Sequence, residues 1–207
     1  MKTIVVTVGC AALLLAGCGA LGSASTQRYF VLEAAPARAV PVPAGTAPSG
    51  QATTLLVAPT SAAGFYDTQE IVYSRAPGER AYYQLSSWTE PPARSFNTLL
   101  VSRLEQARSF ATVAQTTSGM RGTFLLRTHL IEMFHDATTN PGNVRVVLAA
   151  EVIAPDTRTL VARRTFSAAV PARSFDAAGA VRGFDEAVAT IADDVTEWVG
   201  AEAAPRR

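Results

Sequence analysis

The chain has 207 residues with 18 basic and 17 acidic side chains, so its formal net charge is +1. A nearly neutral chain argues against nucleic-acid binding, which depends on positive charge near phosphates. The two cysteines, Cys10 and Cys18, both lie near the N-terminus. The sequence after Cys18 can therefore form no disulfide and no thiolate metal site, and it holds no cysteine nucleophile.

The N-terminal residues have the pattern of a secretory signal. Lys2 precedes an apolar run over residues 4–15, which is shorter than the ~20 residues of a membrane-spanning helix. The next residues complete the motif Leu-Ala-Gly-Cys at 15–18, which resembles the bacterial lipobox. In a lipobox the cysteine thiol is diacylated and becomes the mature N-terminus. The alternatives are an ordinary signal peptide with an incidental cysteine, and a buried cysteine in a core helix.

We therefore expect a signal peptide at 1–17, a lipid (palmitate among its acyl chains) on Cys18, and a flexible lipidated tether over 18–26. Gly19 and Ala20 follow the cysteine where similar lipoproteins of the inner membrane tend to have aspartate. By this resemblance we expect the protein to be anchored at the periplasmic side of the outer membrane. The inner membrane is the less favoured location.

The first half of the domain reads as strands separated by loops. Aromatic and branched residues predict a strand over 28–32, and a proline- and alanine-rich loop follows at 34–52. A buried strand is predicted over 53–58. Residues 70–74 and 81–88 are predicted to pair as a hairpin across Pro77-Gly78.

At Pro91-Pro92 the period changes from two to that of a helix. Apolar residues then recur three to four apart: Ala93, Phe96, Leu100, Leu104 and Ala107. A strand over 110–115 follows. The segment 81–115 resembles a β-α-β unit, which would make part of the sheet parallel.

Three long strands are predicted over 122–136, 143–154 and 159–170, joined by turn sequences. In the second strand, alternate residues predict a buried face: Val144, Val146, Leu148, Ala150 and Val152. The third is predicted to bury Leu160, Ala162, Phe166, Ala168 and Val170.

The last helix has a continuous apolar stripe. Its members step by three and four residues: Val181, Phe184, Val188, Ile191, Val195 and Trp198. Ser174 or Asp176 is predicted to cap its start and Gly200 to end it, leaving a disordered tail at 201–207. The opposite, solvent side is predicted to carry four acidic residues: Asp185, Asp193, Asp194 and Glu197.

These elements predict a single α+β domain over 27–200. Its expected architecture is a two-layer sandwich, in which a mixed, mostly antiparallel β-sheet carries two main helices on one face.

Catalytic and metal-binding patterns are missing from the sequence. His129 and His135 are six residues apart on one predicted strand, so they should share a face but lie roughly 20 Å apart, too far to bind one metal ion. Glu132 lies between them with the opposite parity. No zinc-protease, serine-hydrolase or phosphate-loop motif occurs. We therefore expect no enzymatic activity, no metal and no cofactor, although one sequence leaves open a triad assembled by folding.

An ordered series of aromatic and proline residues crosses the centre of the chain. It comprises Ile71-Val72-Tyr73, Tyr82-Tyr83, Trp88, Glu90-Pro91-Pro92 and the helix 96–104. Together with the lipobox, the early strand Tyr29-Phe30-Val31-Leu32 and the C-terminal helix, the series is similar to the ABC-type transport auxiliary lipoprotein family.

The resemblance implies a non-enzymatic, lipid-anchored periplasmic protein that works with a mammalian-cell-entry-type protein and an ABC transporter moving lipids between the two membranes. A homo-oligomer is possible. The chain lacks a nucleotide-binding loop, so the energy would come from a partner. The alternative is an anchored accessory protein for cell-wall synthesis or lipopolysaccharide assembly.

The parity of the strand 81–88 suggests a contact surface. Tyr82 and Tyr83 point to opposite faces. If Tyr83 and Leu85 face the core, Tyr82 and Trp88 share the outer face, and tyrosine and tryptophan are enriched at protein interfaces. We expect Tyr82 and Trp88 to bind a partner. Packing of Trp88 under the helix that starts at Pro91 is the alternative.

Overall fold

In the computed structural model, the structure describes residues 26–33, 36 and 53–203. The predicted signal peptide, Cys18, nearly all of the tether, almost the entire loop 34–52 and the last tail residues lie outside these ranges. In the part that is described, no helix is long and apolar enough to cross a bilayer.

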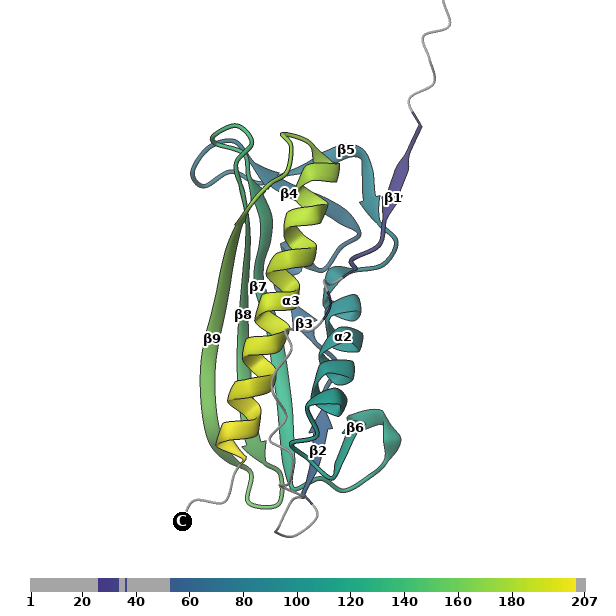
Figure 1. Cartoon of the computed structure of the whole chain (residues 1–207), viewed down its shortest axis with the longest axis vertical. Coiled ribbons are helices and arrows are strands. Elements are labelled where there is room, and N and C mark those ends of the chain that lie inside the picture. Colours follow the sequence, from purple (N-terminus) through teal and green to yellow (C-terminus); the bar gives the residue numbers. More distant parts are fainter. Residues whose placement is uncertain (1–25, 34–35, 37–52, 204–207) are drawn as a thin grey trace, which may run out of the picture.

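The described residues form one nine-stranded sheet with two α-helices against one of its faces (Figure 1). The strands are β1 (Arg28–Phe30), β2 (Thr54–Val57), β3 (Ser61–Ala62), β4 (Glu70–Ser74), β5 (Ala81–Trp88), β6 (Thr112–Gln115), β7 (Phe124–Asp136), β8 (Asn143–Ala154) and β9 (Thr159–Pro171). The α-helices are α2 (Pro92–Ala107) and α3 (Ala177–Glu202), and η2 (Gly64–Tyr66) and η3 (Thr116–Ser118) are short 3-10 helices. The predicted α+β sandwich is confirmed.

Strand β7 is the central strand of the sheet and pairs with four others. Along one edge it pairs antiparallel with β8, which pairs antiparallel with β9. Along its other edge lie β2, β3 and β4, all parallel to β7, in that order from its start to its end. The predicted hairpin is confirmed, since β4 and β5 pair antiparallel, and β1 then joins β5 in parallel.

The predicted β-α-β unit is wrong as a parallel crossover. The two strands that flank α2 lie in different parts of the sheet: β5 pairs with β4 and β1, whereas β6 pairs with β2. Because β5 is antiparallel to β4 while β2 and β4 both run with β7, β5 and β6 also run in opposite directions. The parallel pairing comes from the short strands beside β7 instead.

The apolar stripe of α3 faces the sheet as predicted, and all six of its members are buried. Gly200 does not end the helix, which continues to Glu202. A side chain at Gly200 would come within 3.0 Å of the Ser109 hydroxyl, so close packing explains the glycine. Asp193 is not on the solvent side either: it is 14% exposed and pairs with Arg103 of α2, with 3.4 Å from Nε to Oδ1.

Strand β8 buries the face that its alternation predicts. In β9 the prediction fails at one end, because the β8–β9 pairing shifts register between Val152 and Ile153. Leu160, which precedes this irregularity, is exposed, whereas Phe166 beyond it is buried. A strict alternation of faces holds only where the register is continuous.

Candidate functional site

Tyr82 lies on the surface, as its parity predicts. Its side chain is 39% exposed and its ring stacks on Phe65, with 4.8 Å between ring centroids and 9° between ring planes. Phe65 belongs to η2 and is 41% exposed. No sequence pattern singles out Phe65, because it lies in a short 3-10 helix whose contact with β5 depends on the fold. We call Phe65 and Tyr82 the aromatic pair.

A partly buried arginine–aromatic cluster lies behind the aromatic pair. The Tyr66 ring meets Phe65 edge-on at 5.9 Å, and the Tyr66 hydroxyl accepts a hydrogen bond of 3.0 Å from Nε of Arg80. The guanidinium of Arg80 in turn lies 3.7 Å from the centre of the Phe134 ring. Tyr66, Arg80 and Phe134 thus pack behind Phe65, and Phe65 stacks on Tyr82. Both exposed rings are therefore already ordered before a partner binds.

Trp88 does not share this surface, and its predicted exposure is wrong. It is 2% exposed and packs edge-on against Phe184 of α3. A buried Trp88 is not placed to bind a partner. The alternative was right that Trp88 is in the core, but the ring it contacts belongs to α3 and not to the helix that starts at Pro91.

A bulge in β5 explains why parity failed. Glu70 pairs with Ser87 and Val72 with Tyr82, so β5 advances five residues while β4 advances two. Within the extra length Leu85 has φ of 57°, an uncommon conformation for a residue with a side chain. The alternation reverses there: Leu85, predicted to be inside, is exposed, and Trp88 turns into the core.

On the other side of the same hairpin, four rings follow one another from β4 to the loop before α3. Tyr73 packs on Tyr83 at 4.7 Å, Tyr83 on His135 at 6.2 Å and His135 on Phe175 at 6.1 Å. Because Phe175 is exposed and His135 is fully buried, this series connects the core to the surface beside the start of α3.

Hydrogen bonds hold His135 in one neutral state. Its Nε2 lies 2.7 Å from the Pro141 carbonyl, which can only accept, so Nε2 carries the proton and donates. Nδ1 then accepts from the Tyr83 hydroxyl at 2.7 Å. Burial lowers the pKa of His135 and raises the pKa of Tyr83 to about 12. Both groups are neutral at pH 7 and serve as packing and hydrogen-bonding groups.

The two histidines do not share a face, contrary to the parity argument. The β7–β8 pairing shifts register between Leu130 and Glu132, which reverses the alternation. His129 is therefore exposed, with Nδ1 2.9 Å from the Ser61 hydroxyl, while His135 is buried. Within the described ranges, no group of three or more His, Cys, Asp or Glu side chains is placed to hold a metal ion.

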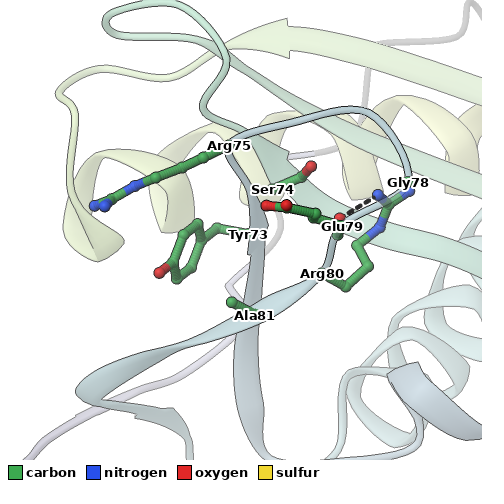
Figure 2. A pocket seen from close by; sticks show the side chains of 7 residues that line it. All are labelled: Tyr73, Ser74, Arg75, Gly78, Glu79, Arg80 and Ala81. Atoms are coloured by element: carbon green, nitrogen blue, oxygen red, sulfur yellow. Dashed lines mark hydrogen bonds between the residues drawn. The ribbon is translucent and has the colours of Figure 1, made fainter.

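The turn between β4 and β5 encloses an open hollow of about 390 Å³. Figure 2 shows its lining: Tyr73, Ser74, Arg75, Gly78, Glu79, Arg80 and Ala81. Arg75 extends over the Tyr73 ring, 5.2 Å from its centre, whereas Arg80 lies at the opposite side and donates to the Glu79 carbonyl. Arg75 and Arg80 thus lie on opposite sides of an open hollow, and their donors do not converge on one point. The hollow therefore lacks the enclosed shape and convergent polar groups of a small-molecule site.

A family model described as the ABC-type transport auxiliary lipoprotein component matches residues 31–196. No curated protein is significantly similar in sequence. Protein XCC0632 from Xanthomonas campestris has a similar crystal structure, with a TM-score of 0.73 and 24% identity over 84% of this chain and 95% of that chain.

A second crystal structure, of an uncharacterized protein, has a TM-score of 0.65 and 12% identity over 84% of this chain and 99% of that chain. At such identities the two structures establish a shared fold alone. The family model, in contrast, spans most of the described domain, including β4, β5 and nearly all of the apolar stripe of α3. This chain belongs to the ABC-type transport auxiliary lipoprotein family.

Proposed function

We propose that the protein is a lipoprotein, acylated on Cys18 and held at the periplasmic side of the outer membrane. There it acts as the auxiliary component of an ABC-type system that moves lipid between the two membranes. Its family is one of transport auxiliaries and not of enzymes. It acts by binding a mammalian-cell-entry-type protein, without catalysis of its own.

The aromatic pair carries this proposal. Phe65 and Tyr82 expose two stacked rings that are backed by fixed groups, and rigid aromatic side chains are the residues that most often dominate binding energy at interfaces. Neither ring is needed to fill the core, since each is about two-fifths exposed. A partner that covers the pair removes this apolar surface from water.

Two single substitutions test the docking surface. Tyr82→Ala and Phe65→Ala should each lower recovery of the cell-entry-type protein in a pull-down by at least tenfold, while the melting temperature stays within a degree or two. Leu160→Ala is the matched control, because Leu160 is an exposed apolar residue on a distant strand. Unchanged recovery with Tyr82→Ala would contradict docking at the pair, and recovery of a cell-wall or lipopolysaccharide-assembly protein instead would favour the alternative role.

The anchor is tested separately. Cys18→Ser should release the protein from membranes, because the variant lacks the thiol that would carry the lipid. Stable anchoring needs two or more acyl chains. Intact-mass measurement of the membrane-extracted parent should show a diacylated cysteine at the N-terminus. An unmodified Cys18 would overturn the proposed anchoring.

A further inference from the structure

One end of the molecule gathers segments that are far apart in sequence. The first residues of β1, the β4–β5 turn and the start of α3 lie together at this end (Figure 1). The pKa shifts agree with this arrangement. The hydrogen bond from Gly179 is the main cause that lowers the pKa of Asp176, and Arg182 and Arg28 lower it further. Burial is the main cause that raises the pKa of Tyr83, with smaller opposing effects from Asp176 and Arg75. We call this the β1 end.

The surface of the β1 end combines exposed rings with arginines. Tyr29 is 67% exposed and Phe175 is 41% exposed. Arg28, Arg75 and Arg182 are exposed as well, and no carboxylate among the described residues lies within ion-pair distance of them.

Ring contacts orient two of these arginines. The Arg28 guanidinium lies 5.0 Å from the centre of the Phe30 ring. The Arg75 guanidinium lies 5.2 Å from the centre of the Tyr73 ring. A guanidinium held on a ring keeps its donors available for a phosphate.

Most carboxylates at the β1 end are already engaged. Asp176 caps α3, Asp136 accepts from Thr138, and Glu186 pairs with Arg173. Glu79 at the β4–β5 turn offsets part of the remaining positive charge. Among the residues that the structure describes, Arg28, Arg75 and Arg182 therefore carry positive charge that no ion pair neutralises and that can attract a phosphate.

The length of the chain before β1 restricts how the protein can sit on a membrane. Arg28 is ten positions after Cys18, so the chain between them spans about 35 Å at most. Helix α3 has 26 residues and is ~39 Å long. For the opposite end to touch the membrane, the stretch would have to run back along the whole domain before reaching the lipid, and it is too short to do so.

We propose that the β1 end lies against the phospholipid headgroups of the membrane that holds Cys18. This inference rests on the proposed anchoring. Tyr29 and Phe175 enter the interfacial layer, where aromatic rings are favoured, and Arg28, Arg75 and Arg182 bind lipid phosphates. Tyr82 points to the opposite face of β5 from Tyr83, whose ring series leads to Phe175, so the aromatic pair Phe65–Tyr82 stays accessible to the transport partner.

A fluorescent probe at single introduced cysteines tests the orientation. In the full-length protein acylated at Cys18, the mature chain has no other thiol, so Phe175→Cys can be labelled selectively. In phosphatidylethanolamine–phosphatidylglycerol vesicles that contain a headgroup-attached quencher, the probe at 175 should be quenched at least threefold. The same probe at Leu160→Cys, beside the β8–β9 turn at the opposite end, should be quenched little (Figure 1).

Equal quenching at the two positions, or no quenching at 175, would overturn the proposal. Tyr29→Cys serves as a second probe should Phe175→Cys fail to fold. Protection of position 175 only after a cell-entry-type protein is added would identify a protein contact instead, and would also overturn it. Unacylated Cys18 is a separate failure, because the protein would then not be in the vesicle fraction at all.

The arginines are tested with the triple variant Arg28→Gln, Arg75→Gln and Arg182→Gln. The quenching at 175 should fall at least twofold in this variant while its melting temperature is unchanged. Arg158→Gln, in the β8–β9 turn, is the matched control and should leave the quenching as it was. Unchanged quenching in the triple variant would contradict phosphate binding by these arginines.

Discussion

The Trp88 indole packs edge-on against the Phe184 ring, with 5.8 Å between the ring centroids and 66° between the ring planes. This contact joins the last residue of β5 to the eighth residue of α3, so it links the strand that carries Tyr82 to the helical layer. Both side chains are buried, and Phe184 is among the largest fully buried residues. The hairpin that carries Tyr82 is thereby fixed to the core at its far end.

Phe184→Ala should lower the free energy of unfolding by about 3–5 kcal/mol, because it removes a buried ring and leaves a cavity. Trp198→Ala, which removes the edge-on contact with Phe166, should have an effect of the same size. Denaturant unfolding measures both. Phe65→Ala is the control and should change the stability by about 0.5 kcal/mol or less, since the ring is exposed. A midpoint for Phe184→Ala equal to that of the parent would show that the α3 stripe faces something other than the core.

Asp176→Ala should cost about 1 kcal/mol of stability. The Asp176 carboxylate accepts from the Gly179 backbone N–H at 2.7 Å and from the Ser174 hydroxyl at 2.8 Å, and these bonds hold its pKa below the usual range. Asp176→Asn keeps an acceptor for the N–H and should retain most of the stability at pH 7. If the two variants were equally destabilised, the negative charge of Asp176, and not its hydrogen bond to the Gly179 N–H, would be what stabilises the helix.

Continuous patterns in the sequence predicted the fold well. The stripe of α3, the buried face of β8 and the β4–β5 hairpin depend on local spacing, and each is present. The pairing of β2, β3 and β4 with β7 depends on contacts between distant segments, which spacing does not encode. For this reason the β-α-β interpretation of 81–115 was wrong.

The candidate site was harder to predict because irregular backbone positions decide it. Parity placed Tyr82 correctly, but the bulge at Leu85 moved Trp88 to the core, and the register shift after Leu130 separated His129 from His135. One inserted residue reverses every later side chain, so a single irregularity outweighs a regular pattern. Phe65 belongs to no periodic pattern in the sequence, and only its stacking on Tyr82 in the folded structure identifies it as part of the site.

Asp185 should make stability depend on pH. Burial raises the pKa of its carboxyl to about 6, with a smaller opposing effect from the Glu33 N–H, which donates to Oδ1 at 3.0 Å. The native state therefore holds a proton that the unfolded chain releases near the ordinary pKa of 3.8. The resulting stabilisation is present below pH ~4 and is lost as the pH rises through about 6.

Asp185→Asn keeps an acceptor for the Glu33 N–H and removes this titration. Its melting temperature, relative to that of the parent, should increase between pH 4 and pH 7. Ala201→Ser, an exposed substitution on the same helix that changes no titratable group, should show a constant difference from the parent. A flat difference for Asp185→Asn as well would mean that the Asp185 carboxyl is solvated like an ordinary surface group.

Arg103 and Asp193 connect the two helices through a largely buried ion pair, at 7% and 14% exposure. Removing one partner leaves the other charge buried with less compensation, so Asp193→Leu should cost about 3–5 kcal/mol. The double variant Arg103→Met with Asp193→Leu replaces both charges by apolar groups, and its stability should return to within about 1 kcal/mol of the parent.

A double-mutant cycle measures this coupling directly. The exposed pair Arg173 and Glu186, also at 3.4 Å, is the matched control and should show a coupling of about 1 kcal/mol or less. Strong coupling at the buried pair alone would mean that burial, and not distance, determines what the ion pair contributes to α2–α3 packing. Additive effects of the two single substitutions would contradict this, because each charge would then be compensated by groups other than its partner.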